Sequence, residues 1–364
     1  MALAGTRQAA KNVRQPHQSD TVNWLNIGLM MGACGAAIAA PYQVFLLAYA
    51  FLGPLHYLTE ISWLHDRRYF ARRDLARQWW LALVALTILA LIFTYASAGS
   101  PNGAVSPLLG STLIYLVFAA AAVAIYVRDW RIGIGILLAV ALGLALLSGY
   151  PMYAWAVLAA IFLTTIVHVF VFTGAFILLG ALKSRSLVGV LSLAVFVGCA
   201  AIAITVKAPF APPTAYVRQL YLSFEFLNRA LLLLFNRPSG VYEPVGAGVM
   251  RLIAFAYLYH YLNWFSKTSI IKWHEVGRNR AVGILGFWLA GGAVYLYDYR
   301  LGLGLFYFLS LLHVFLEFPL NHQTFVEIGK AIGGGVFCGW QKSPAPHFQG
   351  AGNPSQQRRQ PTKA

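Results

Sequence analysis

Long runs of hydrophobic residues alternate with short polar or basic stretches along most of the chain. A run of about 20 apolar residues is long enough to cross a bilayer as an α-helix. The pattern therefore predicts an all-α integral membrane protein with about ten transmembrane helices. The predicted spans are residues 22–40, 42–64, 79–98, 107–127, 132–149, 152–181, 186–206, 246–266, 281–298 and 301–319.

Composition supports the membrane assignment independently of the pattern. Of the 364 residues, 59% are hydrophobic and only 10% are charged, and the mean hydropathy is +0.65. These values exclude a soluble globular protein of this length, which carries a much larger share of charged residues. We expect an integral protein of a bacterial inner (plasma) membrane.

The distribution of basic residues predicts the orientation of the helices. The formal net charge is +16, and most of the 27 Lys and Arg residues fall on one side of the membrane when ten crossings are counted from a cytoplasmic N-terminus. Because basic loops are retained in the cytoplasm, we predict that both termini are cytoplasmic. The basic residues are spread over many loops, so we expect membrane lipids as partners and no nucleic acid.

Three regions follow from this topology. Residues 1–21 form a polar cytoplasmic tail, residues 22–320 form the membrane domain, and residues 321–364 form a mostly mobile, basic cytoplasmic tail. Within the membrane domain, residues 207–245 lie outside, on the periplasmic or extracellular face. Residues 213–235 in that segment have the pattern of an interfacial amphipathic helix, although an eleventh span is the alternative.

A spaced motif of polar residues occurs twice within the apolar runs. Residues 55–65 and 312–322 both read L-H-x-x-x-E-x-x-x-x-H, and composition alone predicts far fewer than one such match. Each histidine lies four residues before a glutamate, so the two side chains share one helix face. His56 with Glu60, and His313 with Glu317, each offer an imidazole nitrogen and a carboxylate to one point.

The second histidine of each copy needs a change in the backbone. His65 and His322 lie five residues after the glutamate, and on a continuous helix they point away from it. We predict that Pro319 breaks the helix before His322, and that a bend at Asp66 returns His65 to the site. With these two histidines and His260, which the topology places at the same depth, the predicted metal ligands are His56, Glu60, His65, His260, His313, Glu317 and His322.

Four other residues are candidates for positioning these ligands or for relaying protons: His168, Asp66, Asn263 and His274. A simpler interpretation exists for every one of the histidines, because His, Tyr and Trp are common at the headgroup level of membrane proteins. Against it, ionisable residues inside membrane spans are costly and are usually functional. The two glutamates, Glu60 and Glu317, are the candidate catalytic residues.

Ligand type suggests the metal. Imidazole with carboxylate suits iron, manganese or zinc, and three scattered cysteines offer no thiolate cluster. Up to seven ligands would serve two metals, as in helical di-iron carboxylate sites, whereas a single iron needs fewer. We predict one or two iron ions, with zinc as the alternative cofactor. The predicted function is a non-haem iron oxidase, desaturase or hydroxylase that acts on a lipid-like substrate at the cytoplasmic face, with an electron donor protein as a partner.

Three other functions fit parts of the pattern. A zinc-dependent lipid hydrolase would use Glu60 or Glu317 as the general base. A proton-coupled transporter would use the histidines and glutamates as a relay. Ligation of haem by His168 and His260 is a further geometric option.

The oxidase interpretation is similar in kind to the integral-membrane fatty-acid desaturases and hydroxylases. The chain lacks their HxxxH and HxxHH clusters. No residue role can therefore be transferred from them.

Overall fold

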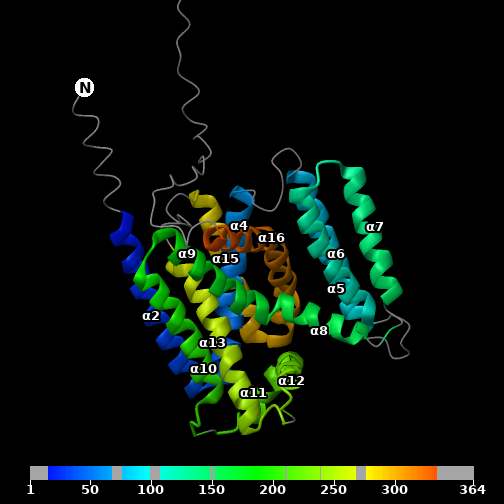
Figure 1. The fold of residues 1–364 in the computed structure, drawn as a ribbon. Helices are drawn as coiled ribbons and strands as arrows, with labels where there is room; N and C mark the ends of the chain where they lie inside the picture. The colour runs from blue at the N-terminus through cyan, green and yellow to red at the C-terminus, as the bar shows by residue number, and fades with distance from the viewer. Residues whose placement is uncertain are drawn as a thin grey trace, which may run out of the picture. The chain divides into compact units, whose positions relative to one another are not determined.

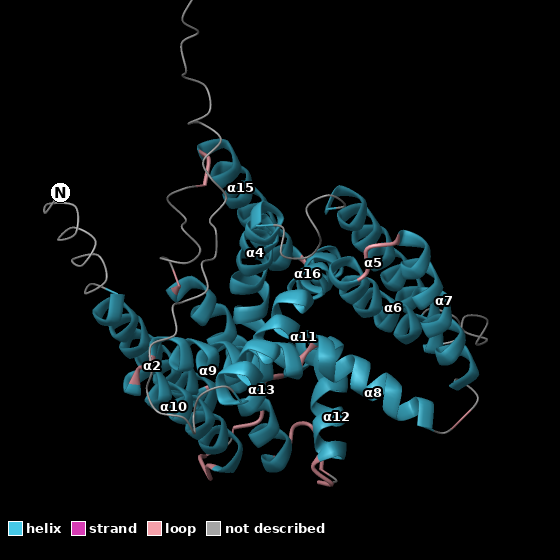
Figure 2. Ribbon diagram, turned by 45° about the horizontal axis from the view of Figure 1, so that its top comes forward, coloured by secondary structure: helices cyan, strands magenta, loops and turns pink. Residues whose placement is uncertain are grey.

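Nearly all of the described part of the chain is helical. A computed structural model describes residues 15–67, 76–98, 107–147, 150, 152–209, 211–237, 239–267 and 276–333. Figure 2 shows helices and loops in this part and no strand. The sequence explains this class of fold, because a backbone in lipid must satisfy its own hydrogen bonds and a helix does so within one segment.

The first group of helices comprises α2 (Gln15–Ala39), α3 (Pro41–Leu47), α4 (Gly53–Arg67), α5 (Ala76–Ala98), α6 (Pro107–Tyr126), α7 (Trp130–Leu147), α8 (Met152–Thr164) and α9 (Thr173–Ser184). The second group comprises α10 (Leu187–Thr205), α11 (Ala215–Tyr221), α12 (Glu225–Leu234), α13 (Pro244–Ser266), α15 (Arg278–Tyr297) and α16 (Tyr299–Gly333). Two wider, π-helical turns interrupt the α-helices: η1 (Ala48–Leu52) joins α3 to α4, and η2 (Val167–Phe172) directly precedes α9. A 3₁₀ turn, η3 (Leu222–Phe224), joins α11 to α12.

The predicted all-α membrane fold is confirmed. Nine helices of the described part are long and apolar enough to cross a membrane. Each of the ten predicted spans overlaps one or more of the helices, and the one at 107–127 corresponds to α6, which contributes the shorter apolar stretch Gly110–Tyr126.

Two local predictions are wrong. The predicted span 152–181 is interrupted, because α8 ends at Thr164 and the segment suited to crossing begins at Val167. The predicted break at Pro319 does not occur, because α16 continues through this residue to Gly333. A proline removes one backbone hydrogen bond, and Pro319 is buried among neighbouring helices, which can stabilise a helix against that loss.

α13 is the central helix of the main core. It contacts α2, α3, α4, α10 and α12, and 78% of its apolar window is buried. Small residues such as Gly246, Ala247, Gly248 and Ala254 allow these neighbours to approach its backbone closely. Figure 1 shows α2, α10 and α13 side by side, and the contacts between these helices agree with the picture.

A second core lies where α5 and α6 meet α4 and α16. Leu64 of α4, Phe118 of α6 and Phe315 of α16 are buried together, and the rings of Phe118 and Phe315 are 4.9 Å apart. All of these contacts lie within a compact unit that covers Met1–Ile328. The two cores meet at α4 and α16, which carry the two copies of the His-Glu motif.

Candidate metal centre

Six ionisable side chains from four helical segments meet in the protein interior. They are His56 and Glu60 of α4, His168 of η2, His260 of α13, and His313 and Glu317 of α16. Each is at most 7% exposed. Burial of this many ionisable groups at membrane depth is costly unless they are paired or bind a ligand.

The π-helical turns help to orient two of the histidines. η2 contains His168 itself, and η1 ends four residues before His56. A π turn accommodates extra backbone in the helix and therefore changes which face the following side chains occupy. Such turns are often found at functional sites, and here each precedes or contains an inward-facing histidine.

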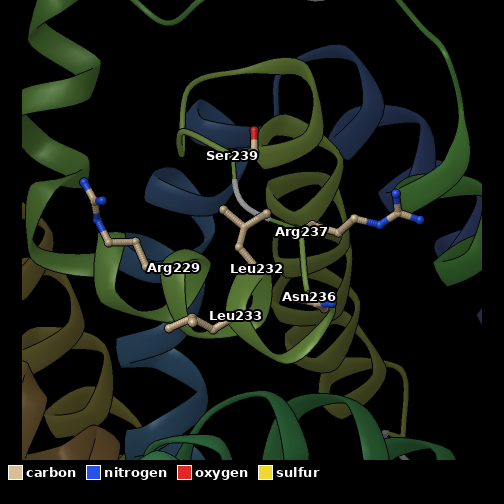
Figure 3. Close-up of a pocket in the computed structure, with 6 residues that line it drawn as sticks. All are labelled: Arg229, Leu232, Leu233, Asn236, Arg237 and Ser239. Carbon is tan, nitrogen blue, oxygen red and sulfur yellow. The ribbon is translucent and has the colours of Figure 1, made fainter.

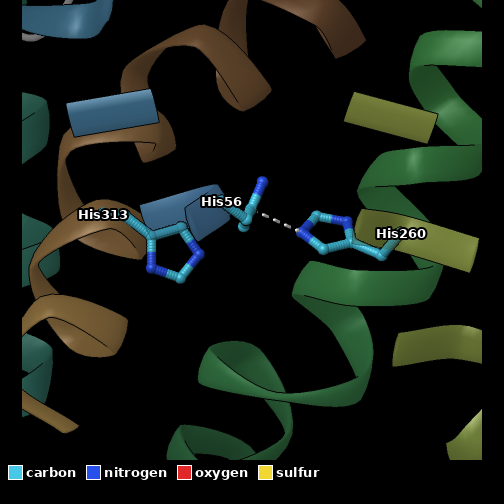
Figure 4. Close-up of side chains that lie close together, drawn as sticks. All are labelled: His56, His260 and His313. Carbon is cyan, nitrogen blue, oxygen red and sulfur yellow. Dashed lines mark hydrogen bonds between the residues drawn. The ribbon is translucent and has the colours of Figure 1, made fainter. Parts of the chain in front are cut away.

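The four imidazoles form a closed ring, which we call the histidine ring. Centroids of successive rings lie 4.8 Å apart for His56 and His260, 4.9 Å for His260 and His168, 5.0 Å for His168 and His313, and 5.2 Å for His313 and His56. Figure 4 shows three of these side chains, with His56 between the other two.

The Nε2 atoms approach each other in pairs. The Nε2 atoms of His56 and His260 are 3.1 Å apart, and so are those of His168 and His313. Two nitrogens bound to one metal at about 2.0–2.1 Å would lie about 2.9 Å apart in an octahedral site and about 3.3 Å apart in a tetrahedral one. The observed spacing is therefore that of adjacent ligands. His56, His260 and His313 place one ligand atom each within 4.8 Å of one another.

The opposite nitrogen of three rings faces an oxygen atom. His260 Nδ1 lies 2.9 Å from the Thr173 hydroxyl, and His313 Nδ1 lies 3.3 Å from the carbonyl oxygen of Leu309. His168 Nδ1 lies 3.3 Å from Glu317 Oε2. When Nδ1–H donates to such an oxygen, Nε2 carries no proton and has a free electron pair. This is the usual arrangement of a metal-binding histidine.

The two glutamates occupy different positions relative to the ring. Glu60 Oε2 lies 3.0 Å from His56 Nε2, the nitrogen that faces His260, whereas Glu317 Oε2 faces the outer nitrogen of His168. Neither Oε2 atom has a hydrogen bond of good geometry among the described residues. Glu60 therefore lies next to the inner nitrogen of His56, and Glu317 lies next to the outer nitrogen of His168.

Aromatic residues surround the ring and restrict its motion. Tyr57 stacks on His313 with 4.5 Å between centroids and an angle of 24°. The hydroxyl of Tyr57 lies 2.8 Å from that of Tyr261, and Trp264 packs edge-on against His56. Close packing of this kind limits the rotamers of the imidazoles and keeps bulk water away from them.

A lysine lies beside the two carboxylates. Lys267 directly follows α13, and burial lowers its pKa to about 8, while Glu317 and Glu60 oppose that shift. Its Nζ atom lies 5.7 Å from the ring centre of Phe176. The lysine offsets part of the negative charge of the two glutamates.

The structure brings together five of the seven predicted ligands, namely His56, Glu60, His260, His313 and Glu317. It does not bring His65 or His322 to the ring. His65 is 58% exposed and packs against Trp80, and the Nδ1 atom of His322 lies 2.6 Å from the Tyr126 hydroxyl. Both positions follow from the continuation of α4 and α16 as helices. A side chain nine residues beyond His56 or His313 then lies on the opposite face of the helix.

The candidate positioning residues have different surroundings. His168 belongs to the ring itself, which its isolated position in the sequence did not indicate. Asn263 is buried on α13, and Asp66 forms an ion pair with Arg280 at the surface. His274 lies outside the described residues.

A separate cavity of about 350 Å³ lies at the end of α12 and is lined by Arg229, Leu232, Leu233, Asn236, Arg237 and Ser239. Figure 3 shows the side chains of Arg229 and Arg237 pointing in opposite directions, and Arg229 is already paired with Glu225. The cavity therefore does not present a convergent set of charges, and none of its lining residues belongs to the histidine ring.

Comparison with known proteins adds no assignment. No family model, curated protein or solved structure matches the chain. The chemistry is therefore argued from the site alone: a buried group of three histidines, His56, His260 and His313, could hold a metal ion in a helical membrane protein.

Proposed function

We propose that the protein is a membrane-embedded, non-haem iron oxidoreductase that oxidises, desaturates or hydroxylates a lipid-like substrate. The observation that carries the proposal is the convergence of imidazole Nε2 atoms, at 3.1 Å in two pairs, with the opposite nitrogens held by oxygen atoms. The oxygen atoms at Nδ1 of His260 and His313 favour a free electron pair on the Nε2 atom of each ring, and each of these Nε2 atoms faces the Nε2 atom of another histidine.

The number and type of ligands support iron over zinc. Four imidazoles with Glu60 exceed the three protein ligands that catalytic zinc usually has. Nitrogen and carboxylate ligands with open positions are typical of non-haem iron in oxygen-dependent enzymes. Ferrous iron bound there would supply the activation of O2, and an electron donor protein would supply the electrons that the substrate does not.

The residues of the chain have distinct roles in this proposal. His56, His168, His260 and His313 hold the metal, and Glu60 completes the ligand set. Glu317 orients His168 through its outer nitrogen. The packed aromatic side chains around the ring exclude water, which protects an oxidising site from side reactions.

The basic loops support a location of the ring near the cytoplasmic face. His260 lies six residues before the end of α13, about 9 Å along the helix axis, and Lys267 follows that end. A site at this depth is reached by lipid chains from the inner leaflet. The substrate, the electron donor and the bacterial inner membrane are part of the proposal.

Elemental analysis of the detergent-purified protein, with an optical spectrum of the same sample, tests the proposal. We expect about one or two iron atoms per chain and no Soret band. Stoichiometric zinc would instead favour the lipid hydrolase, with Glu60 as general base. If no metal binds after reconstitution, the oxidoreductase is wrong and the proton-coupled transporter becomes the better function.

A further inference from the structure

A row of polar side chains leads away from the histidine ring along two helices. On α13, Asn263 follows His260 by three residues and shares its face, and Lys267 comes directly after the end of the helix, four residues beyond Asn263. On α16, Asn321 follows Glu317 by four residues. His168 connects the two rows, because its ring lies 4.9 Å from that of His260 and its Nδ1 atom lies 3.3 Å from Glu317 Oε2. We call Asn263, Lys267, Glu317 and Asn321 the polar column.

The polar column contains buried amides without partners. Asn321 is 1% exposed, and neither atom of its amide makes a hydrogen bond of good geometry within the described part of the chain, although it adjoins Glu317. Asn263 is 6% exposed, and its Oδ1 atom also makes no hydrogen bond of good geometry within the described part of the chain. Buried amides normally have partners, so a molecule that supplies them is expected in the column.

Charge indicates what that molecule carries. Among the described residues, the ionisable groups of the ring and column other than the histidines are Glu60, Glu317 and Lys267, whose formal charges add up to one negative charge. A divalent metal in the ring changes this sum to one positive charge. An unbalanced buried charge is costly, and one negative charge on a ligand would remove it.

We propose that the polar column binds the ionised carboxylate of a single-chain lipid, which is the substrate of the proposed oxidoreductase. This inference rests on the proposed function, because the charge balance requires a metal in the ring. Lys267 lies seven residues beyond His260, about 10 Å along the helix axis. With its carboxylate at Lys267, the lipid places carbons in the middle of its chain, and not those next to the carboxylate, at the metal.

Titration calorimetry with laurate on the metal-loaded, full-length protein in neutral detergent tests the proposal. Methyl laurate has the chain without the charge, and acetate has the charge without the chain. We expect laurate to bind about tenfold to hundredfold more tightly than methyl laurate, which is the affinity equivalent of one hydrogen bond to a charged group. Metal removal should reduce this preference, because it leaves the site negative.

Substitutions at Lys267 identify the residue responsible. Lys267→Gln should abolish the preference for laurate over its ester, and Lys267→Arg should keep it. Lys183→Gln is the matched control, because Lys183 is an exposed lysine at the end of another helix, α9, where it pairs with Glu327. If gel filtration shows that Lys267→Gln folds poorly, the preference for laurate over methyl laurate is compared between Lys267→Arg and the wild-type protein. That comparison still tests the proposal.

The outcomes separate this inference from the proposed function. Protein that holds metal but binds laurate and methyl laurate equally overturns the inference alone, and so does a preference that survives in Lys267→Gln. Acetate binding as tightly as laurate shows an anion site without a lipid chain, which also overturns it. Protein that holds no metal overturns the proposed function and this inference with it.

Discussion

At the scale of single residues, the environment of each imidazole explains why some histidines join the site. His56, His168, His260 and His313 are buried, and three of them have an oxygen atom at Nδ1. His65 and His322 lie at exposed positions on the same two helices as His56 and His313. The motif thus occurs twice in the sequence, but only the first histidine and the glutamate of each copy lie at the site.

Metal content of histidine variants tests this division. We expect His56→Ala, His168→Ala and His313→Ala each to lose most of the bound metal, because each removes one of the converging nitrogens. His65→Ala and His322→Ala should retain wild-type metal content. Elemental analysis of the folded, monodisperse fraction of each variant measures this. Full metal content in His168→Ala would show that the ring of four histidines is not the ligand set.

The two glutamates should respond differently to substitution. Glu317 orients His168 from outside, so Glu317→Gln, which keeps an oxygen acceptor, should weaken metal binding less than Glu317→Ala. Loss of a residue that supports a metal-binding histidine in this way typically costs about tenfold to hundredfold in metal affinity. Competition with a chelator measures the affinity of each variant. Equal losses in the two variants would mean that the carboxylate charge, and not the hydrogen bond, is what matters.

At the scale of elements, the π-helical turns and the small residues of α13 set the rotation and spacing of the helices. Each of the turns η1 and η2 changes the rotation of a helical segment that carries a histidine of the ring. The position of neither turn can be predicted from a simple sequence pattern. Gly246 illustrates the spacing: a Cβ atom there would lie 2.3 Å from the carbonyl oxygen of Gly240 and 2.4 Å from that of Val241. Both are backbone atoms, which cannot rotate away.

Gly246→Ala should therefore destabilise the protein. Overpacking of this kind costs about 1–3 kcal/mol, and thermal unfolding in detergent would show it as a lower transition temperature. Gly198→Ala on α10 is the matched control, because the methyl group of an alanine there would meet no atom within 4 Å and alanine favours a helix. A stability of Gly246→Ala equal to that of the control would contradict the close contact between the start of α13 and the loop before it.

At the scale of the whole molecule, the helices form a membrane bundle with basic residues at one set of helix ends. α4 ends at Arg67, α9 at Ser184 with Lys183 in its last turn, and α13 at Ser266 before Lys267. Of the three ends, that of α13 is nearest to its histidine, six residues beyond His260. Figure 1 shows α4 and α9 ending on the same side of the bundle. This side is the cytoplasmic one if the rule for basic loops holds.

Cysteine labelling in intact cells tests this orientation. In a Cys338→Ser background, where Cys34 and Cys199 are buried, Tyr216→Cys should react with a membrane-impermeant maleimide added outside. Ser184→Cys, at an exposed position at the end of α9, should react only after the cells are permeabilised. The reverse pattern would place the ring at the outer face and would remove the argument for a cytoplasmic electron donor.

The sequence by itself determined the class of the protein, the approximate positions of most of its long apolar helices and the two His-Glu pairs, because hydrophobic length and the period of a helix are local properties. It also predicted that these pairs lie at similar depths. Only the tertiary structure decided that His168 completes the ring, that His65 and His322 stay outside, and that Glu60 and Glu317 face different nitrogens. Those features depend on how each helix is rotated about its own axis, which the π turns and the packing around α13 set and which no local pattern encodes.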